Sequence, residues 1–322
     1  MTPPTNSPTS ATRSTSSRRH RRRWWIAPLV LAGGFAVLEI AAALRVSSLR
    51  AQRSTLAGLL YVKELGTGDP MIFLAGLAGT TTYWGNALDR LAGEHRLLLL
   101  DTLGFGNSPW PDLEYTLEEH LDALRQTLIA RGATDRVTLV GHSFGAILAA
   151  HYAARFPADI ERVVLLGTPI FRSPAEGRAR IRAMSSTAGL FSLNRTVARA
   201  SCKFHEAFGP LLMRLLPRID HHLPPAVLAE GMLHTWQAFD GSLRHVVLAS
   251  PIEIPLRQIG SLVTLVHGRH DPITALERVR EVADDVGATV VVTDDNHGSY
   301  ASREPDSLLR VVGPRPTDRG WS

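Results

Sequence analysis

Three polar residue types in this sequence are those that nucleophilic catalysis needs: serine, histidine and aspartate. Ser143 lies in a Gly-His-Ser-Phe-Gly pentapeptide at 141–145, between an apolar β-like run at 136–140 and a helix of small residues from 146. A serine hydroxyl is a weak nucleophile that requires a base, and the base requires an orienting acid. The pentapeptide alone is also compatible with a glycine-flanked turn that caps a helix, so its interpretation depends on the rest of the chain.

The sequence around Ser143 fits a strand followed by a tight turn and a helix. Two flanking glycines allow a strand and a helix to pack closely around such a turn. Behind it, Gly145, Ala149 and Ala153 recur every four residues, which gives the helix one smooth face toward a sheet. The pattern therefore predicts an exposed hydroxyl at a strand-to-helix turn.

A base and an acid are expected at the same sheet edge, because the carboxyl ends of parallel strands meet there. Asp271 follows a β-rich run at 262–267, and His297 follows another at 289–293. A helical stretch at 275–285 joins the two runs, so we expect Asp271 and His297 on neighbouring strand ends. Asp294 and Asp295 are ranked below Asp271, since their closeness in sequence to His297 constrains their approach.

Acyl transfer also requires two N–H donors for the oxyanion. The residue after the serine, Phe144, supplies one amide at the start of its helix. The loop 75–79, rich in small residues, follows a strand-like run and offers the amide of Leu77 as the second. The predicted site is therefore Ser143, His297 and Asp271, with an oxyanion hole formed by Phe144 and Leu77.

Short apolar runs alternate with helical segments along most of the chain. Buried parallel strands show such continuous apolar runs, and the alternation predicts an α/β fold with a mostly parallel sheet. The expected strands are 59–65, 71–75, 96–101, 137–141, 163–167, 262–267 and 289–293. The expected helices between them are 84–92, 117–130, 146–156 and 275–285. The interval 169–259 has little β pattern and predicts a helical cap, with helices near 175–184, 193–208, 210–216, 225–239 and 243–247.

Over residues 58–312 the chain resembles the α/β-hydrolase family. The resemblance rests on the pentapeptide at 141–145, the D-x-x-G-x-G-x-S loop at 101–108, the Gly-Arg-His-Asp segment at 268–271 and the Asn-His pair at 296–297. It implies a core of 58–168 and 260–312 around the cap. One departure is Ala75, where such proteins often have histidine, which leaves the oxyanion donors less well defined.

The resemblance implies a hydrolase that needs no cofactor. The expected substrate is a small molecule, a medium-size and fairly hydrophobic acyl ester. Serine at position 143 argues against dehalogenase-like and epoxide-hydrolase-like members of the family, which attack with a carboxylate. Carboxylesterase-like chemistry is expected, with C–C bond hydrolysis or perhydrolysis by the same triad as alternatives. A non-catalytic binding protein that kept the fold is the alternative of another class.

No metal site is expected from the sequence. The chain has a single cysteine, Cys202, so neither an intramolecular disulfide nor a cysteine-based metal cluster can form. The cap histidines His205, His221, His222 and His234 are interpreted as solvated or core residues, because none forms a pair with supporting metal-ligand context.

The excess of positive charge, +5 over 322 residues, belongs to the N-terminal tail. Residues 1–23 contain six arginines and no acidic residue, and their Ser, Thr and Pro content predicts disorder. The remainder of the chain is nearly neutral, which argues against a nucleic-acid partner. A flexible Pro- and Gly-containing tail is expected at 313–322.

Residues 24–44 form an apolar run of 21 residues with one charge, Glu39. As a helix this run would span roughly 32 Å, enough to cross a bilayer core. The preceding arginines would stay in the cytoplasm, with a linker at 45–57 and the catalytic domain outside the cytoplasm. A cleaved signal peptide followed by secretion is the alternative, although its apolar region is usually only about 7–15 residues long.

Overall fold

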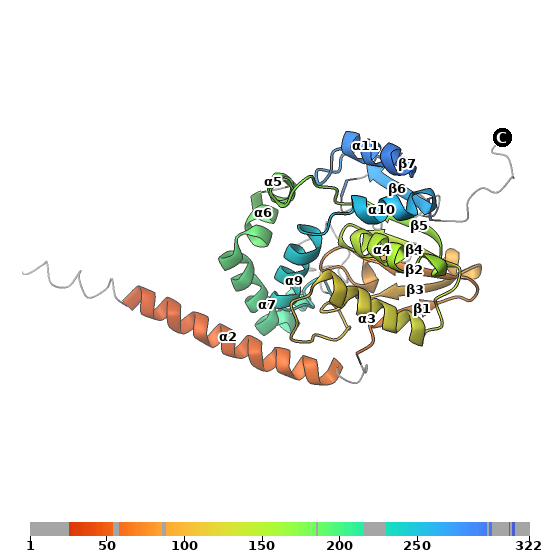
Figure 1. The fold of residues 1–322 in the computed structure, drawn as a ribbon. Helices are drawn as coiled ribbons and strands as arrows, with labels where there is room; N and C mark the ends of the chain where they lie inside the picture. Colours follow the sequence, from red (N-terminus) through yellow and green to blue (C-terminus); the bar gives the residue numbers. More distant parts are fainter. Residues whose placement is uncertain are drawn as a thin grey trace, which may run out of the picture.

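A seven-stranded sheet forms the centre of the molecule (Figure 1). The computed structural model describes residues 26–53, 58–85, 88–184, 186–215, 230–294, 296–297, 309 and 311–312. The strands are β1 (Val62–Leu65), β2 (Pro70–Leu74), β3 (Arg96–Leu100), β4 (Val137–His142), β5 (Ile160–Leu166), β6 (Val263–Gly268) and β7 (Thr289–Thr293), in the order β1-β3-β2-β4-β5-β6-β7. Only β1 pairs antiparallel to its neighbour, and all seven strands fall where the sequence predicts strands.

Both faces of the sheet are buried, which explains the continuous apolar runs in its strands. In β2, Ile72 and Leu74 face one core while Met71 and Phe73 face the other. Successive side chains of a strand point to opposite faces, so each residue of the run is covered by a separate layer. Burying each such side chain contributes about 1.5–3 kcal/mol.

Helices cover the sheet as the alternating pattern predicts (Figure 1). They are α3 (Leu117–Ala130), α4 (Phe144–Arg155), α10 (Glu253–Ile259) and α11 (Leu276–Val286). A capping box between Thr116 and Glu119 begins α3. Gly287, in the left-handed conformation, ends α11. The helix α10 was not expected from the sequence.

The described residues of the predicted helix at 84–92 do not form an α-helix. Trp84 ends a 3-10 turn, η2 (Thr81–Trp84), residues 85 and 88–90 form turns, and a second 3-10 turn follows, η3 (Leu91–Gly93). Trp84 is fully buried and packs edge-to-face on Phe73. The apolar residues of this stretch therefore fill the core beneath the sheet from a loop.

The interval between β5 and β6 forms a helical cap beside the carboxyl ends of the strands (Figure 1). Its helices are α5 (Pro174–Met184), α6 (Ser186–Leu193), α7 (Arg195–Leu215) and α9 (Trp236–Gly241), followed by a π-helical turn, η6 (Ser242–Val247). The helices predicted at 193–208 and 210–216 are one continuous helix, although Pro210 lies within it. The helix α6 was not predicted, and 225–229 lies outside the described residues.

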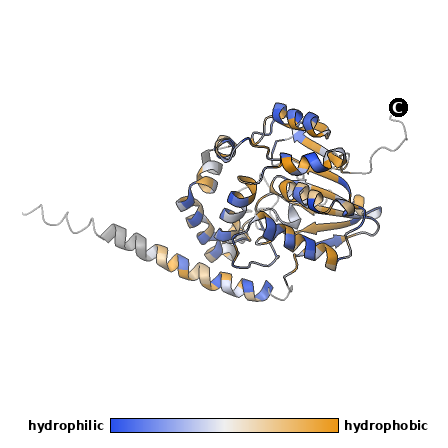
Figure 2. Cartoon of the chain, in the orientation of Figure 1, coloured by the Kyte–Doolittle hydropathy of each residue, from blue (hydrophilic) through white to orange (hydrophobic). Residues whose placement is uncertain are grey.

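The N-terminal helix α2 (Ile26–Arg53) is longer than the predicted span and includes most of the predicted linker at 45–57. Its side chains are described from residue 34, and apolar residues give way to polar ones toward its end (Figure 2). Among the side chains described, no helix combines the length and apolar character needed to cross a bilayer. The membrane span predicted at 24–44 is therefore not supported by the structure.

Polar contacts hold α2 against the cap and the core. Glu39 forms an ion pair with Arg199 of α7 at 2.9 Å, so the one charge of the apolar run has a partner. Arg45 donates to the carbonyl oxygens of His205 and Glu206, at 2.8 and 2.6 Å. Farther along, Arg53 donates to the Gly106 carbonyl oxygen at 2.8 Å. These contacts explain why helix continues through the predicted linker.

Gly145 lets α4 approach β2 closely, and its replacement by alanine is expected to destabilise the fold. A Cβ at this position would lie 2.2 Å from the Leu74 carbonyl oxygen. We expect Gly145→Ala to lower the free energy of unfolding by about 1–3 kcal/mol in denaturant titrations. Gly93→Ala is the matched control, because nothing lies within 4 Å of its added Cβ. That control should change the free energy by less than about 0.5 kcal/mol, and an equal effect of both variants would contradict the packing argument.

Candidate active site

Ser143 occupies a strained turn between β4 and α4. Its φ of 52° is in the left-handed region, which residues other than glycine rarely adopt. Holding a residue in this conformation costs about 1–3 kcal/mol. A Cβ on Gly141 would lie 2.4 Å from the Gly145 carbonyl oxygen, so the flanking glycines permit the close turn. The Ser143 amide donates to the Leu166 carbonyl oxygen at 2.9 Å and fixes the turn against β5.

The structure brings Ser143, His297 and Asp271 into one hydrogen-bonded chain. His297 Nε2 lies 2.9 Å from Ser143 Oγ, and His297 Nδ1 lies 2.8 Å from Asp271 Oδ2. Asp271 follows β6 and His297 follows β7, and these strands pair in parallel. With Nδ1 donating to the carboxylate, Nε2 is free of a proton and accepts from the serine hydroxyl. The arrangement is that of a nucleophile, a base and an orienting acid.

Asp271 is ionised in this arrangement. Burial opposes its charge, but hydrogen bonding and charge from His297, together with the Ile273 amide, outweigh that effect and hold the carboxyl pKa below its usual value. A carboxylate with a lowered folded-state pKa stabilises the fold above its unfolded pKa of about 3.9. This contribution is lost as the pH falls through the lowered pKa.

His142, the residue before the serine, contacts His297 directly. Its Nε2–H donates to the His297 carbonyl oxygen at 2.7 Å, and its ring stacks on Tyr83 at 5.0 Å. Burial lowers the pKa of His142 to about 3, so the ring is neutral at physiological pH. His142 thus positions the backbone of His297. Its place in the pentapeptide gave no signal for this contact, because the partner lies 155 residues away.

The predicted oxyanion donors flank the serine. Phe144 begins α4, where amide groups and the helix dipole favour a developing negative charge. Leu77 lies in the loop after β2, which is the neighbour of β4. That loop lies against the turn at Ser143, since a Cβ added to Gly76 would be 3.0 Å from His142 Nδ1 and 3.4 Å from Ser143 Cβ. Ala75, the first residue of this loop, is buried.

Asp101 organises the loops beside the site, a role that its position in the sequence did not indicate. Its carboxylate accepts from the amides of Thr81 and Asn107, at 2.7 and 2.8 Å. It thereby joins the segment after the oxyanion loop to the loop at 101–108. Burial raises its pKa to about 6, so these amide bonds keep a carboxylate in a poorly solvated place.

A cavity of about 280 Å³ lies over Ser143 and His297. Apolar side chains from the cap and the core form most of its wall. The lining residues are Gly76, Leu77, Gly79, Tyr83, His142, Ser143, Pro169, Phe171, Ile181, Met184, Ser192, Phe239, Leu243, Val247, Ile273 and His297. Such a site fits a small apolar group placed against a reactive hydroxyl.

Comparison with known families agrees with the fold and the motifs. A family model described as alpha/beta hydrolase fold matches residues 69–302, which is most of the chain. The chain therefore belongs to the α/β-hydrolase family.

Curated relatives with several activities match parts of this chain. The probable lysophospholipase BODYGUARD 1 of Arabidopsis thaliana is 28% identical over 238 residues, which cover 65% of this chain and 50% of that protein. A cis-3-alkyl-4-alkyloxetan-2-one decarboxylase of Shewanella oneidensis is 34% identical over 119 residues, covering 36% of this chain and 37% of the relative. A haloalkane dehalogenase of Agrobacterium fabrum is 37% identical over 117 residues, covering 35% and 37%. The chain spans half or less of the length of these relatives.

Solved structures share the fold at low sequence identity. The esterase from Exiguobacterium antarcticum has a TM-score of 0.59 and 18% identity, covering 79% of this chain and 92% of that chain. A hydrolase from Pseudomonas aeruginosa has a TM-score of 0.58 and 23% identity, covering 79% and 94%. At these identities the likeness concerns the fold.

Asp271→Asn should impair any reaction that uses His297 as a base. The amide would retain an oxygen for the Ile273 amide but would turn an N–H group toward His297, which favours the wrong imidazole tautomer. We expect ester hydrolysis to fall roughly 10²–10⁴-fold, with an unchanged circular dichroism spectrum.

Asp294→Asn is the matched control for this variant. Its carboxylate follows the neighbouring strand, is 90% exposed and contacts Arg269 at 3.3 Å. Hydrolysis rates of this control should stay close to wild type. A larger loss from Asp294→Asn than from Asp271→Asn would contradict the assignment of the acid.

Proposed function

We propose that this protein is a serine hydrolase that cleaves an acyl ester through a covalent acyl-enzyme. The observation that carries the proposal is the hydrogen-bonded chain from Ser143 through His297 to Asp271, at 2.9 and 2.8 Å. The strained φ of 52° at Ser143 supports it, because strain of this kind persists where function requires it.

In the proposed mechanism, Ser143 Oγ attacks the acyl carbonyl carbon while His297 Nε2 takes the hydroxyl proton. Asp271 stabilises the resulting imidazolium, and the amides of Phe144 and Leu77 bind the oxyanion. His297 then gives its proton to the departing alcohol. Water attacks the acyl-enzyme with His297 again as the base, which releases the acid and restores Ser143.

The substrate we propose has an apolar acyl group of modest length. Aromatic and aliphatic side chains dominate the cavity wall above the serine, including Phe171, Ile181, Met184 and Phe239. The similarity to a probable lysophospholipase supports an ester of the lipid class. A haloalkane dehalogenase is among the relatives. Dehalogenase-like members attack with a carboxylate, however, and this chain has serine at position 143, which argues against that reaction.

We further propose that the protein attaches to a membrane through its N-terminal segment, with the catalytic domain outside the cytoplasm. The arginine cluster at 18–23 and the apolar run at 24–44 support this proposal. Exposed apolar side chains near this segment also support it, because a water-soluble surface seldom gathers so many. They are Phe35, Val37, Ile40 and Leu44 on α2, and Phe204, Phe208, Leu211 and Leu215 on α7.

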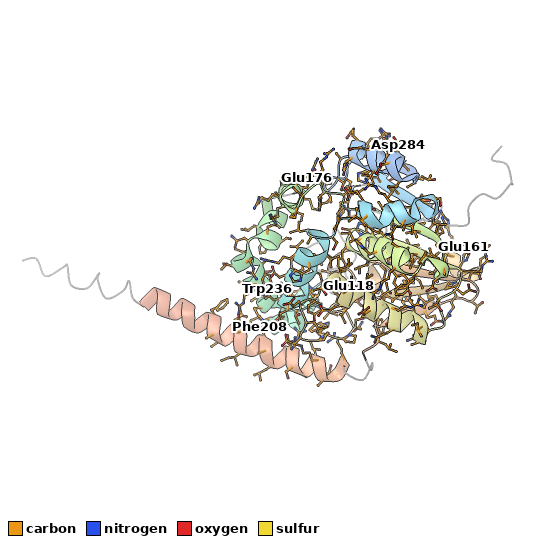
Figure 3. All side chains as sticks on the ribbon, viewed as in Figure 1. Glu118, Glu161, Glu176, Phe208, Trp236 and Asp284 are labelled. Carbon is orange, nitrogen blue, oxygen red and sulfur yellow. The ribbon has the colours of Figure 1, made fainter. Side chains whose placement is uncertain are left out.

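The cap helices α5 to α7 carry more basic than acidic residues. Residues 174–215 contain seven basic residues against two glutamates. The helices α2 and α7 pack side by side, and Phe208 lies on the outer side of the cap near α2 (Figure 3). Exposed apolar residues with surrounding basic residues are typical of surfaces that lie on anionic membranes.

Ser143→Ala should abolish hydrolysis of short aryl esters, because the attacking oxygen is removed. We expect a loss of about 10³-fold or more in steady-state assays of purified protein. Ser192→Ala is the matched control, since Ser192 also lines the cavity. A wild-type rate of hydrolysis in Ser143→Ala would refute the proposed nucleophile. An equal loss of rate in Ser143→Ala and Ser192→Ala would also contradict the assignment of Ser143.

The proposed attachment predicts that the full-length chain stays with membranes after an alkaline carbonate wash. An apolar helix inserted in the bilayer resists this treatment, whereas a peripheral protein is released. Fractionation followed by intact mass measurement would also show whether a signal peptide has been removed. Recovery of uncleaved, full-length chain in the soluble fraction would contradict the proposed membrane attachment.

A further inference from the structure

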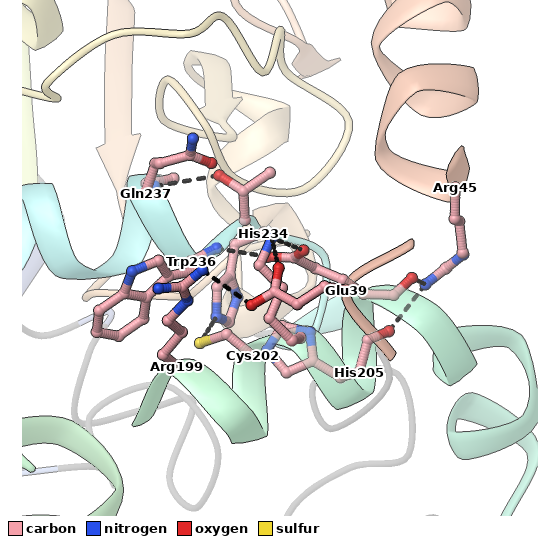
Figure 4. Close-up of polar contacts among 12 residues, drawn as sticks. Glu39, Arg45, Arg199, Cys202, His205, His234, Trp236 and Gln237 are labelled. Atoms are coloured by element: carbon pink, nitrogen blue, oxygen red, sulfur yellow. Dashed lines mark hydrogen bonds and ion pairs between the residues drawn. The ribbon is translucent and has the colours of Figure 1, made fainter. Parts of the chain in front are cut away.

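Three potential metal ligands meet in the cap, away from the residues of the proposed mechanism. Cys202 and His205 lie one turn apart on α7, and His234 comes from the segment before α9. Their candidate ligand atoms all lie within 4.8 Å of one another, and all three residues are more than nine-tenths buried. Figure 4 shows these side chains converging beneath the contacts of α2 with the cap.

The separations suit a common ion. Cys202 Sγ and His234 Nε2 are 3.8 Å apart, the length of a weak S–H···N hydrogen bond. A thiolate and an imidazole bound to one tetrahedral zinc, at about 2.3 and 2.1 Å, would lie about 3.6 Å apart. The rings of His205 and His234 pack edge-to-face with centroids 4.5 Å apart, which keeps both near the cysteine.

Backbone groups hold both rings in the way that metal-binding histidines require. His234 Nδ1 lies 3.1 Å from the Gly231 carbonyl oxygen, so Nδ1 carries the proton and Nε2 offers its lone pair toward the cysteine. His205 hydrogen-bonds to the backbone of Met232. Its Nδ1 is buried and has no hydrogen-bond partner among the described residues. An unsatisfied buried nitrogen is costly, and a metal ion would satisfy it.

We propose that Cys202, His205 and His234 bind a zinc ion in the cap. Binding breaks the S–H bond of Cys202, forms an S–Zn bond and releases the proton to solvent, while each histidine donates a nitrogen lone pair. The three residues leave one position of a tetrahedral ion for water or a further donor. A thiolate with two imidazoles is a ligand set that suits zinc.

The surroundings of the three side chains add a negative charge close to the proposed cation. The adjacent Glu206 carboxylate is buried and bonded to Lys203 and the Trp236 amide.

Such an ion would join the cap to the core. His234 pairs as an isolated β-bridge with Phe105, and the Gly106 amide donates to the Leu233 carbonyl oxygen at 2.7 Å. Both core residues belong to the loop at 101–108 that Asp101 organises. A metal held by α7 and His234 would therefore tie the outer cap helix to a loop beside the active site.

The test is metal binding by full-length protein purified without metal-affinity resin. After equilibration with zinc and removal of free ions, elemental analysis should find one zinc per chain. Cobalt substitution should give a near-ultraviolet thiolate-to-cobalt absorption band, and zinc should raise the melting temperature. Cys202→Ser should remove the absorption band and weaken zinc binding at least about tenfold.

His120→Asn is the matched control, because His120 is also a buried, neutral histidine, bonded to Ser242 at 2.9 Å instead of to the cluster. This variant should bind zinc as the wild type does. Wild-type protein that takes up no stoichiometric zinc and shows no cobalt–thiolate band would overturn the proposal, whatever the variants do. Zinc retained in full by Cys202→Ser would overturn this ligand set. Neither result bears on the role of Ser143.

Discussion

The hydrogen bond between Ser143 Oγ and His297 Nε2 is the contact on which the account of this molecule depends. It joins residues 154 positions apart in the sequence, so it exists only because the sheet brings the ends of β4 and β7 to one edge. Each end imposes its own requirement. Ser143 needs a left-handed turn that two glycines make possible, and His297 needs the carboxylate of Asp271 and the ring of His142 to fix its position.

Much of this arrangement could be predicted from the sequence, because local chemistry determines it. The strands are apolar runs buried on both faces, and parallel strands bring their carboxyl ends together. Asp271 and His297 could therefore be proposed as partners of Ser143 from their positions alone, and the structure brings all three together. Asp294 is nearer in sequence to His297, but its side chain is exposed and contacts Arg269 instead.

What the sequence could not show depends on contacts between distant segments. The sequence of residues 84–92 looks helical, yet Trp84 lies in a 3-10 turn and its side chain is buried in the core. The stretches 193–208 and 210–216 looked like two helices, but they form the single helix α7, which continues through Pro210. The run at 24–44 looked like a separate span with a linker, whereas α2 extends to Arg53 and packs along the cap. Cys202, His205 and His234 looked unrelated because the third residue reaches the cluster only through the fold of the cap.

The central claim is that Ser143 is an activated nucleophile, and reaction with a fluorophosphonate probe tests it most directly. The probe phosphonylates a serine oxygen only where a base removes its proton and an oxyanion hole accepts the charge. Peptide mapping of native, full-length protein should place a single adduct on Ser143, and protein unfolded before labelling should carry none. A native protein that gains no adduct, or gains it at another residue, would contradict the account.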